Sequence, residues 1–171
     1  MSEHFPSFQT QRSALSWLWL SALAVMLDQI SKYMVVKHLA LHEPLALFPS
    51  LNLTLMYNPG AAFSFLSQAG GWQRWMFTGV AVLVSVALVV WLKRLSAKRY
   101  WEAAALALIL GGALGNVIDR IRLGHVIDFI QVYYRDWFFP AFNVADSAIT
   151  LGVIILLADA LFGTRRASAV L

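Results

Sequence analysis

The sequence contains no cysteine and few charged residues. Without cysteine, the chain has no disulfide, no thiolate nucleophile, no cysteine-based metal site and no lipid anchor attached through its own cysteine. Charged residues make up 13% of the chain, whereas a soluble domain contains about 25%. Hydrophobic residues make up 60% of the 171 residues. Because this length suits one domain, we interpret residues 1–171 as a single integral-membrane domain.

Long basic runs are also missing. The net charge of +4 is modest, and no extended basic run is interleaved with aromatic residues. Nucleic acid is therefore not an expected partner. The sequence also has no internal repeat, low-complexity tract or domain linker.

Four apolar stretches are long enough to cross a membrane. A bilayer core of about 30 Å needs roughly 20 mostly apolar residues in a helix, and residues 14–36, 75–92, 101–121 and 142–162 meet this requirement. The first stretch also has features of a secretory signal, with Arg12 before the apolar run and small residues at 22–24. Because the helical pattern continues past residue 24, and cleavage there would leave an odd number of helices, we predict an uncleaved first span.

The distribution of lysine and arginine predicts the orientation of these spans. The link between the second and third spans carries Lys93, Arg94, Lys98 and Arg99, whereas residues 38–72 contain no lysine or arginine. The positive-inside rule places the basic link in the cytoplasm. Both termini are then cytoplasmic, and the segments 38–72 and 122–141 lie outside the membrane or at its outer face.

The two outer segments have different patterns. Residues 51–57 (LNLTLMY) alternate with a period of two, which predicts a strand or hairpin, and residues 58–60 (NPG) predict a turn. The apolar content of this segment suggests that it lies on the membrane surface. The second segment contains an aromatic cluster of the kind found at membrane interfaces, made up of Tyr133, Tyr134, Trp137, Phe138 and Phe139.

Ionisable residues inside apolar spans are costly and often mark function. Asp28 lies near the outer end of the first span, and Lys32 follows it by one helical turn. This spacing predicts an ion pair. A pair that locks helix packing is the simpler interpretation, and direct chemistry is the alternative.

The end of the third span holds a second polar group. Asn116 and Asp119 share a helix face, and Arg120 either pairs with a carboxylate or lies at the interface. A hydrogen-bond network at the helix end explains these residues without catalysis. Upstream, Gly111 and Gly115 form a pair of small residues that permits close helix contact.

Asp128 and Asp146 lie on either side of the aromatic segment. Taken singly, Asp128 is a hydrogen-bonded carboxylate in a membrane-surface loop, and Asp146 is the third residue of a helix capped by Asn143. Taken together, they lie at the ends of neighbouring antiparallel spans on the same side. Two adjacent carboxyl groups share one proton, so one acts as a base on water and the other as an acid. This arrangement predicts peptide hydrolysis without metal, serine or cysteine.

Other functional classes remain open at this stage. Buried acids and lysines also serve proton- or ion-coupled transporters, although such proteins often have internal repeats and midplane sites. A non-catalytic membrane assembly factor is a third class. A metal site is not expected, because the sequence has no His-x-x-x-His or Glu-rich helix motif.

Five motifs, in order along the chain, resemble those of lipoprotein signal peptidase (signal peptidase II), a family of bacterial membrane aspartyl proteases. They are DQISK at 28–32, NPGAAFS at 58–64, GALGNVIDR at 112–120, VIDF at 126–129 and FNVAD at 142–146. The resemblance covers nearly the whole chain. It implies an all-α membrane protein with four transmembrane helices, a small extracytoplasmic β-sheet and a short periplasmic helix within segment 38–72.

The resemblance also implies a function. Asp128 and Asp146 match the catalytic aspartates of the family. Positions that line or support its site are matched by Asp28, Lys32, Asn58, Gly60, Asn116, Asp119, Arg120 and Asn143. The expected substrates are prolipoproteins, cut on the N-terminal side of a cysteine that carries diacylglycerol. The expected setting is the bacterial cytoplasmic membrane, among membrane lipids, with the site near the outer face. We expect a monomer without a cofactor or metal, inhibited by cyclic peptides of the globomycin type.

Overall fold

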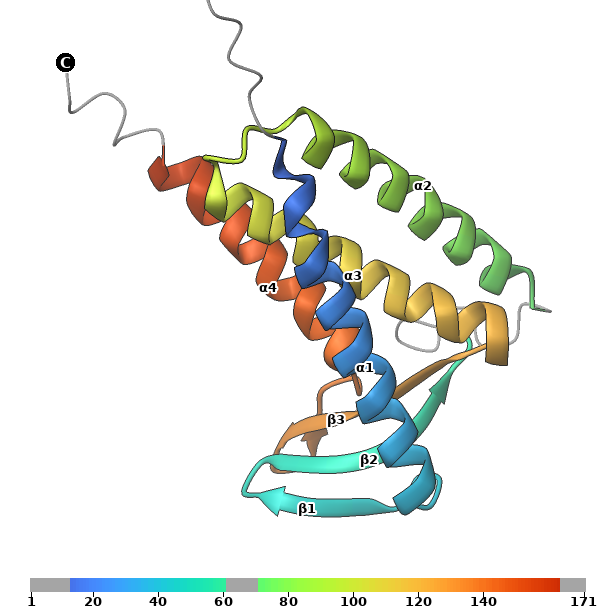
Figure 1. The fold of residues 1–171 in the computed structure, drawn as a ribbon. Coiled ribbons are helices and arrows are strands. Elements are labelled where there is room, and N and C mark those ends of the chain that lie inside the picture. The colour runs from blue at the N-terminus through green and yellow to red at the C-terminus, as the bar shows by residue number, and fades with distance from the viewer. Residues whose placement is uncertain (1–12, 61–70, 164–171) are drawn as a thin grey trace, which may run out of the picture.

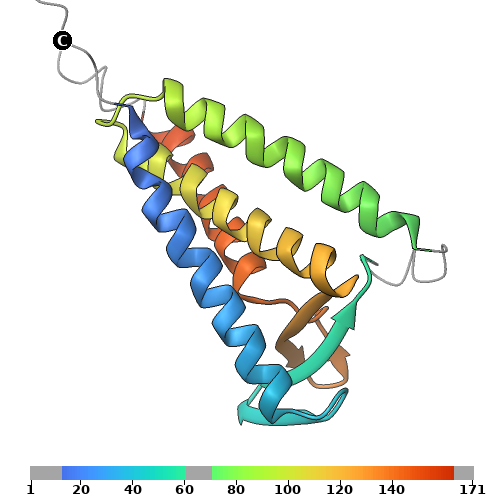
Figure 2. The same cartoon turned by 45° about the vertical axis from the view of Figure 1, so that its right-hand side comes forward.

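The computed structural model describes residues 13–60 and 71–163, which form four long helices and a small sheet (Figures 1 and 2). The long helices are α1 (Leu18–His38), α2 (Trp72–Arg94), α3 (Tyr100–Leu123) and α4 (Val144–Ala158). A 3-10 turn, η1 (Ala14–Trp17), precedes α1, and a π-helical turn, η3 (Asp159–Gly163), follows α4. The strands are β1 (Pro44–Phe48), β2 (Leu51–Asn58), β3 (Val126–Tyr134) and β4 (Trp137–Phe138).

The four predicted spans correspond to four helices that are long and apolar enough to cross a membrane. Helix α2 extends three residues before and two residues after its predicted span, and α3 extends one residue before and two residues after its own. Helix α4 begins at Val144, because Asn143 caps it. The predicted short periplasmic helix within 38–72 falls largely on residues 61–70, which lie outside the described residues.

Helix α3 is the centre of the helical bundle. Two thirds of its apolar window (67%) is buried, whereas the other three helices bury between 11% and 22% of theirs. It packs against α1, α2 and α4, which surround it. In Figures 1 and 2, α2 diverges from α1 towards the end of the molecule that carries the sheet.

Glycines allow the helices to approach α3 closely. A Cβ atom on Gly111 would lie 2.7 Å from the Cβ of Ala24 in α1, and a Cβ on Gly112 would lie 2.3 Å from the carbonyl oxygen of Ala145 in α4. Real Cβ atoms do not come this close to a carbonyl, so these positions admit only glycine without movement of the helices. The predicted small-residue contact at Gly111 and Gly115 is therefore confirmed, and Gly112 adds a second contact towards α4.

The sheet is antiparallel with the strand order β1-β2-β3-β4. The strand predicted at 51–57 is confirmed as β2, in a hairpin with β1. The loop predicted for Asp128 is wrong, because this residue lies within β3, opposite Met56 of β2. The run VIDFI does not alternate as a surface strand would, because Val126 to Phe129 are all buried. Strand β3 is contacted by α1 and α3 in addition to its neighbour β2.

The end of the bundle opposite the sheet brings three chain segments together. The backbone of Ser13 pairs with that of Ser96, and the N–H of Ala14 donates to the carbonyl of Leu95 at 3.0 Å. Arg99 contacts Asp159 at the end of α4 at 3.3 Å. The start of the first helix, the basic link 93–100 and the end of the last helix therefore share one side.

We expect Gly112→Ala to lower stability by about 1–3 kcal/mol, the usual cost of overpacking, because its methyl group would collide with the backbone of α4. Gly79→Ala is the matched control, since no atom lies within 4 Å of a Cβ at that exposed helical position. There alanine should be neutral or stabilising, as it is the better helix former. Thermal unfolding in detergent measures both, and equal midpoints for the two variants would contradict the proposed contact.

Candidate active site

A buried ion cluster joins α1 to α3. Lys32 Nζ lies 2.8 Å from Asp28 Oδ2 and 2.7 Å from Asp119 Oδ2, and all three side chains are almost completely buried. The ion pair predicted between Asp28 and Lys32 is confirmed. Asp119 adds a second carboxylate from the neighbouring helix, so the lysine is held between two helices.

Gln29 completes this cluster and was not singled out by sequence reasoning. Its side-chain amide donates to Asp119 Oδ1 at 2.9 Å and to Asp28 Oδ2 at 3.1 Å, and it lies 3.3 Å from the carbonyl oxygen of Gly115. A glutamine beside an aspartate carries no periodic or charge signal. Its role becomes visible only when α3 is placed beside α1.

The cluster also fixes the start of α4. Asp28 Oδ1 accepts a hydrogen bond from the backbone N–H of Ala145 at 2.9 Å, where the partial positive charge of a helix N-terminus favours an anion. The predicted cap is confirmed: Asn143 Oδ1 accepts from the N–H of Asp146 at 2.9 Å, and Asp146 Oδ2 accepts from the N–H of Asn143 at 3.3 Å. Asp146 is therefore held on the first turn.

Backbone pairing brings β3 beside the start of α4. The N–H of Phe142 donates to the carbonyl of Ile130, and the carbonyl of Phe142 accepts from the N–H groups of Phe129 and Ile130. This pairing places Asn143, which is fully buried, beside Asp128.

Two asparagines connect the candidate carboxyl groups. Asn143 Nδ2 donates to Asp128 Oδ1 at 2.7 Å, and Asn116 Nδ2 donates to Asp146 Oδ1 at 2.7 Å. Asn116 Oδ1 in turn accepts from Lys32 Nζ at 3.1 Å. Asp128 and Asp146 both contact Asn143, so the structure places the two acids at one site.

Asn58 reaches Asp128 from β2. Asn58 and Met56 point to the same face of the sheet, and Asp128 is opposite Met56. Asn58 Nδ2 consequently donates to Asp128 Oδ2 at 2.9 Å. Its Oδ1 accepts from the N–H of Gly60, whose φ of +102° favours glycine.

Arg120 lies beside the acids without forming an ion pair among the described residues. The negative charges of Asp146, Asp128 and Asp119 act on its guanidinium, and the interfacial position stays a prediction. Its Nη1 is 3.4 Å from the carbonyl of Asn116, and its guanidinium lies 5.7 Å from the ring centroid of Phe77. Within the described part of the chain, its buried Nε has no hydrogen-bond partner.

Burial raises the pKa of Asp128 from 3.8 to about 6, and the negative charge of Asp146 acts in the same direction. The hydrogen bonds from Asn58 and Asn143 oppose the rise by stabilising the carboxylate, as does the charge of Lys32. Asp128 is therefore suited to exchange protons near neutral pH.

No three potential ligand side chains among residues 13–60 and 71–163 are arranged to hold a metal ion. His125, the histidine nearest to the acids in sequence, stacks on Tyr57 with ring centroids 4.3 Å apart. Burial lowers its pKa.

The family model described as signal peptidase (SPase) II matches residues 20–162. A protein of Acinetobacter baumannii named lipoprotein signal peptidase is 57% identical over 155 residues, covering 91% of this chain and 88% of the relative. One of Pseudomonas aeruginosa with the same name is 54% identical, covering 85% of this chain and 87% of the relative. The chain belongs to the signal peptidase II family.

The fold agrees with this membership. A solved structure described as a bacterial membrane enzyme, determined by the in meso method at 2.3 Å resolution, matches with a TM-score of 0.78 and 30% identity. The match covers 91% of this chain and 94% of that one. As a signal peptidase II with four apolar helices, the protein is a multi-pass membrane protease that removes signal peptides from prolipoproteins.

We expect Asp28→Ala to destabilise this signal peptidase II by about 3–5 kcal/mol, because it breaks a buried ion pair and removes the acceptor of the Ala145 N–H. Asp136→Ala is the control at an exposed position and should change stability by less than about 0.5 kcal/mol. Thermal unfolding in detergent compares the two. If both variants unfolded together with the wild type, the buried cluster would have no structural role.

The raised pKa of Asp128 predicts a pH dependence of stability. Because the folded protein binds this proton more tightly than the unfolded chain does, protonation stabilises the fold at acid pH, and that contribution is lost as the pH rises from about 4 through about 6. The wild type should lose up to about 3 kcal/mol relative to Asp128→Asn over this range. Unfolding midpoints from pH 4 to pH 8 measure the difference, and parallel curves for the two proteins would contradict it.

Proposed function

We propose that this signal peptidase II is an aspartic endopeptidase in which Asp128 and Asp146 together activate a water molecule. The observation that supports this proposal best is the sharing of Asn143 by two carboxyl groups from different segments, one buried in β3 and the other half-buried on α4. Two carboxyl groups that lie close together cannot both ionise easily, so they hold one proton between them.

The chemistry proceeds in two steps. One carboxylate takes a proton from water while the resulting hydroxide adds to the scissile carbonyl carbon, and the other, protonated carboxyl group gives its proton to the carbonyl oxygen. The tetrahedral intermediate then collapses: the carboxyl group that was protonated by water gives its proton to the departing amine, the other carboxylate takes a proton from a hydroxyl of the intermediate, the C–N bond breaks and the carbonyl forms again. Both carboxyl groups end with one proton between them, ready for the next substrate.

The surrounding asparagine amides orient the two carboxyl groups and affect the pKa of Asp128. Asn58 and Asn143 donate to Asp128, and Asn116 donates to Asp146. These bonds orient the carboxyl oxygens and keep the pKa of Asp128 from rising further. The guanidinium of Arg120, whose Nε has no hydrogen-bond partner among residues 13–60 and 71–163, supplies positive charge where a substrate carbonyl would lie.

We further propose that the substrate is a prolipoprotein bearing a diacylglyceryl cysteine, cut on the N-terminal side of that residue. The site lies at the sheet end of the bundle, whereas the basic link 93–100 lies at the opposite end. The positive-inside rule therefore places the acids near the outer face and both termini in the cytoplasm. A lipid-modified substrate stays in the bilayer, so its scissile bond would reach this interface. The exposed side chains of Tyr134, Trp137 and Phe138 suit this depth.

We expect Asp128→Asn and Asp146→Asn each to reduce cleavage by at least 100- to 10,000-fold, the usual contribution of acid–base catalysis. Asn has nearly the shape of Asp but cannot exchange the proton. Asp136→Asn, the same change at an exposed position, should cleave normally. Cleavage of a diacylglyceryl prolipoprotein by purified variants is followed on a gel. Near-normal activity of Asp128→Asn or Asp146→Asn, with the protein folded, would exclude the two-aspartate mechanism.

A further inference from the structure

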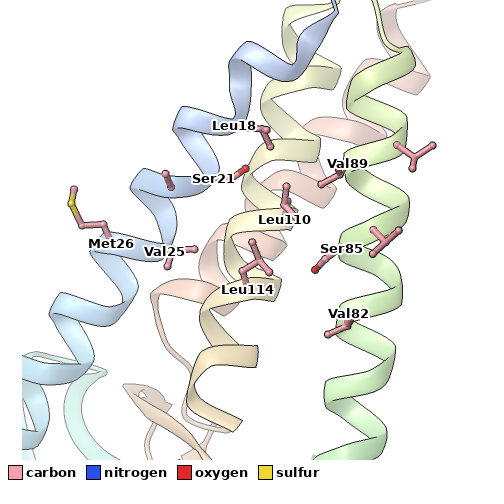
Figure 3. Close-up of a pocket in the computed structure, with 12 residues that line it drawn as sticks. Leu18, Ser21, Val25, Met26, Val82, Ser85, Val89, Leu110 and Leu114 are labelled. Carbon is pink, nitrogen blue, oxygen red and sulfur yellow. The ribbon is translucent and has the colours of Figure 1, made fainter. Parts of the chain in front are cut away.

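A second concave feature lies away from the acids, between α1 and α2. It is a groove of about 730 Å³, open along one side, with α3 as its floor. Figure 3 shows Leu18 and Val25 of α1 facing Val82 and Val89 of α2 across it. The volume is within the range of about 300–1,000 Å³ that small-molecule sites occupy.

The groove has an apolar lining and shares no residue with the proposed catalytic site. Its only hydroxyl groups, on Ser21 and Ser85, already donate to the backbone carbonyls of Ala107 and Ala81 at 2.7 Å. The wall therefore offers an occupant only hydrophobic contact. Val82 and Val86, which line it, are exposed, so the groove is open to the surroundings of the helices.

Positive charge lies at one end of this groove. Val82, Val86, Val89 and Lys93 are spaced by four, three and four residues, which places them on one face of α2. Lys93 is about 6 Å along the helix from Val89. Within the described part of the chain, Lys93 forms no ion pair, and neither do the nearby Arg94 and Lys98.

This charge selects the kind of occupant. A signal peptide has a positive region before its apolar segment, and the basic end of the groove would repel it. An anionic phospholipid has the opposite arrangement, with a negative phosphate at the end of an apolar chain. Basic pockets between transmembrane helices bind such headgroups.

We propose that the groove between α1 and α2 binds an anionic phospholipid, with one acyl chain between the helices and the phosphate at Lys93. The bound lipid fills the groove lined by α1, α2 and α3. It contacts both α1 and α2 and no residue of the proposed catalytic site.

Native mass spectrometry of the purified full-length protein tests this site. The protein is stripped of lipid in detergent and given equal amounts of phosphatidylglycerol and phosphatidylcholine with the same acyl chains. The wild type should retain one phosphatidylglycerol in preference to phosphatidylcholine. Val86→Phe fills the groove and should lose both lipids, whereas Leu83→Phe adds the same ring on the outward face, where Leu83 is 72% exposed, and should retain them.

The headgroup contact has its own pair of variants. Lys93→Gln should keep lipid in the groove but lower the preference for phosphatidylglycerol about fivefold, the effect of one basic residue at an anionic surface. Lys37→Gln makes the same change at an exposed position near the sheet end and should leave the preference unchanged. Because Lys93 is on the surface, this test does not depend on the folding of Val86→Phe.

Three results would overturn the proposal. The first is equal retention of the two lipids by the wild type. The second is identical behaviour of Lys93→Gln and Lys37→Gln, or of Val86→Phe and Leu83→Phe. The third is displacement of phosphatidylglycerol by an unlipidated signal-sequence peptide, which would assign the groove to the substrate.

Discussion

The structure depends on one buried cation. Lys32 lies between Asp28 and Asp119, at 2.8 and 2.7 Å, and it is 2% exposed. A charge removed from water is costly unless it is paired, so α1 and α3 cannot separate here without leaving an uncompensated ion. Since Asp28 also accepts the N–H of Ala145, the same cluster sets the position of α4. One interaction thereby fixes three helices at the end where the site is built.

The proposed catalytic pair is connected to this cluster through amides. Lys32 donates to Asn116, which donates to Asp146, and Asn143 caps α4 while donating to Asp128. The oxygen and the nitrogen of each asparagine side chain bond to different groups. Each asparagine therefore fixes both the separation and the orientation of the groups that it joins. The central helix α3 thus has polar contacts at its sheet end, whereas further along it forms the floor of the lipid-facing groove with Leu110 and Leu114.

Local spacing made part of this site predictable. The Asp28–Lys32 pair and the cap of Asp146 by Asn143 were predictable because both partners lie within one helical turn. The contacts of Gln29 with Asp119 and of Asn58 with Asp128 were not predictable from spacing, since 90 and 70 residues separate the partners. The strand that carries Asp128 was missed because burial from several sides removes its alternation. The family motifs marked Asn58 and Asp119, but their contacts required the fold.

The most direct test of the two-aspartate mechanism is a crystal structure of the enzyme with a peptide inhibitor that carries a hydroxyl group in place of the scissile carbonyl. That hydroxyl imitates the tetrahedral intermediate, so it should lie within about 3 Å of carboxyl oxygens from both Asp128 and Asp146. A hydroxyl bound by only one of the two acids, or held elsewhere in the protein, would contradict the mechanism.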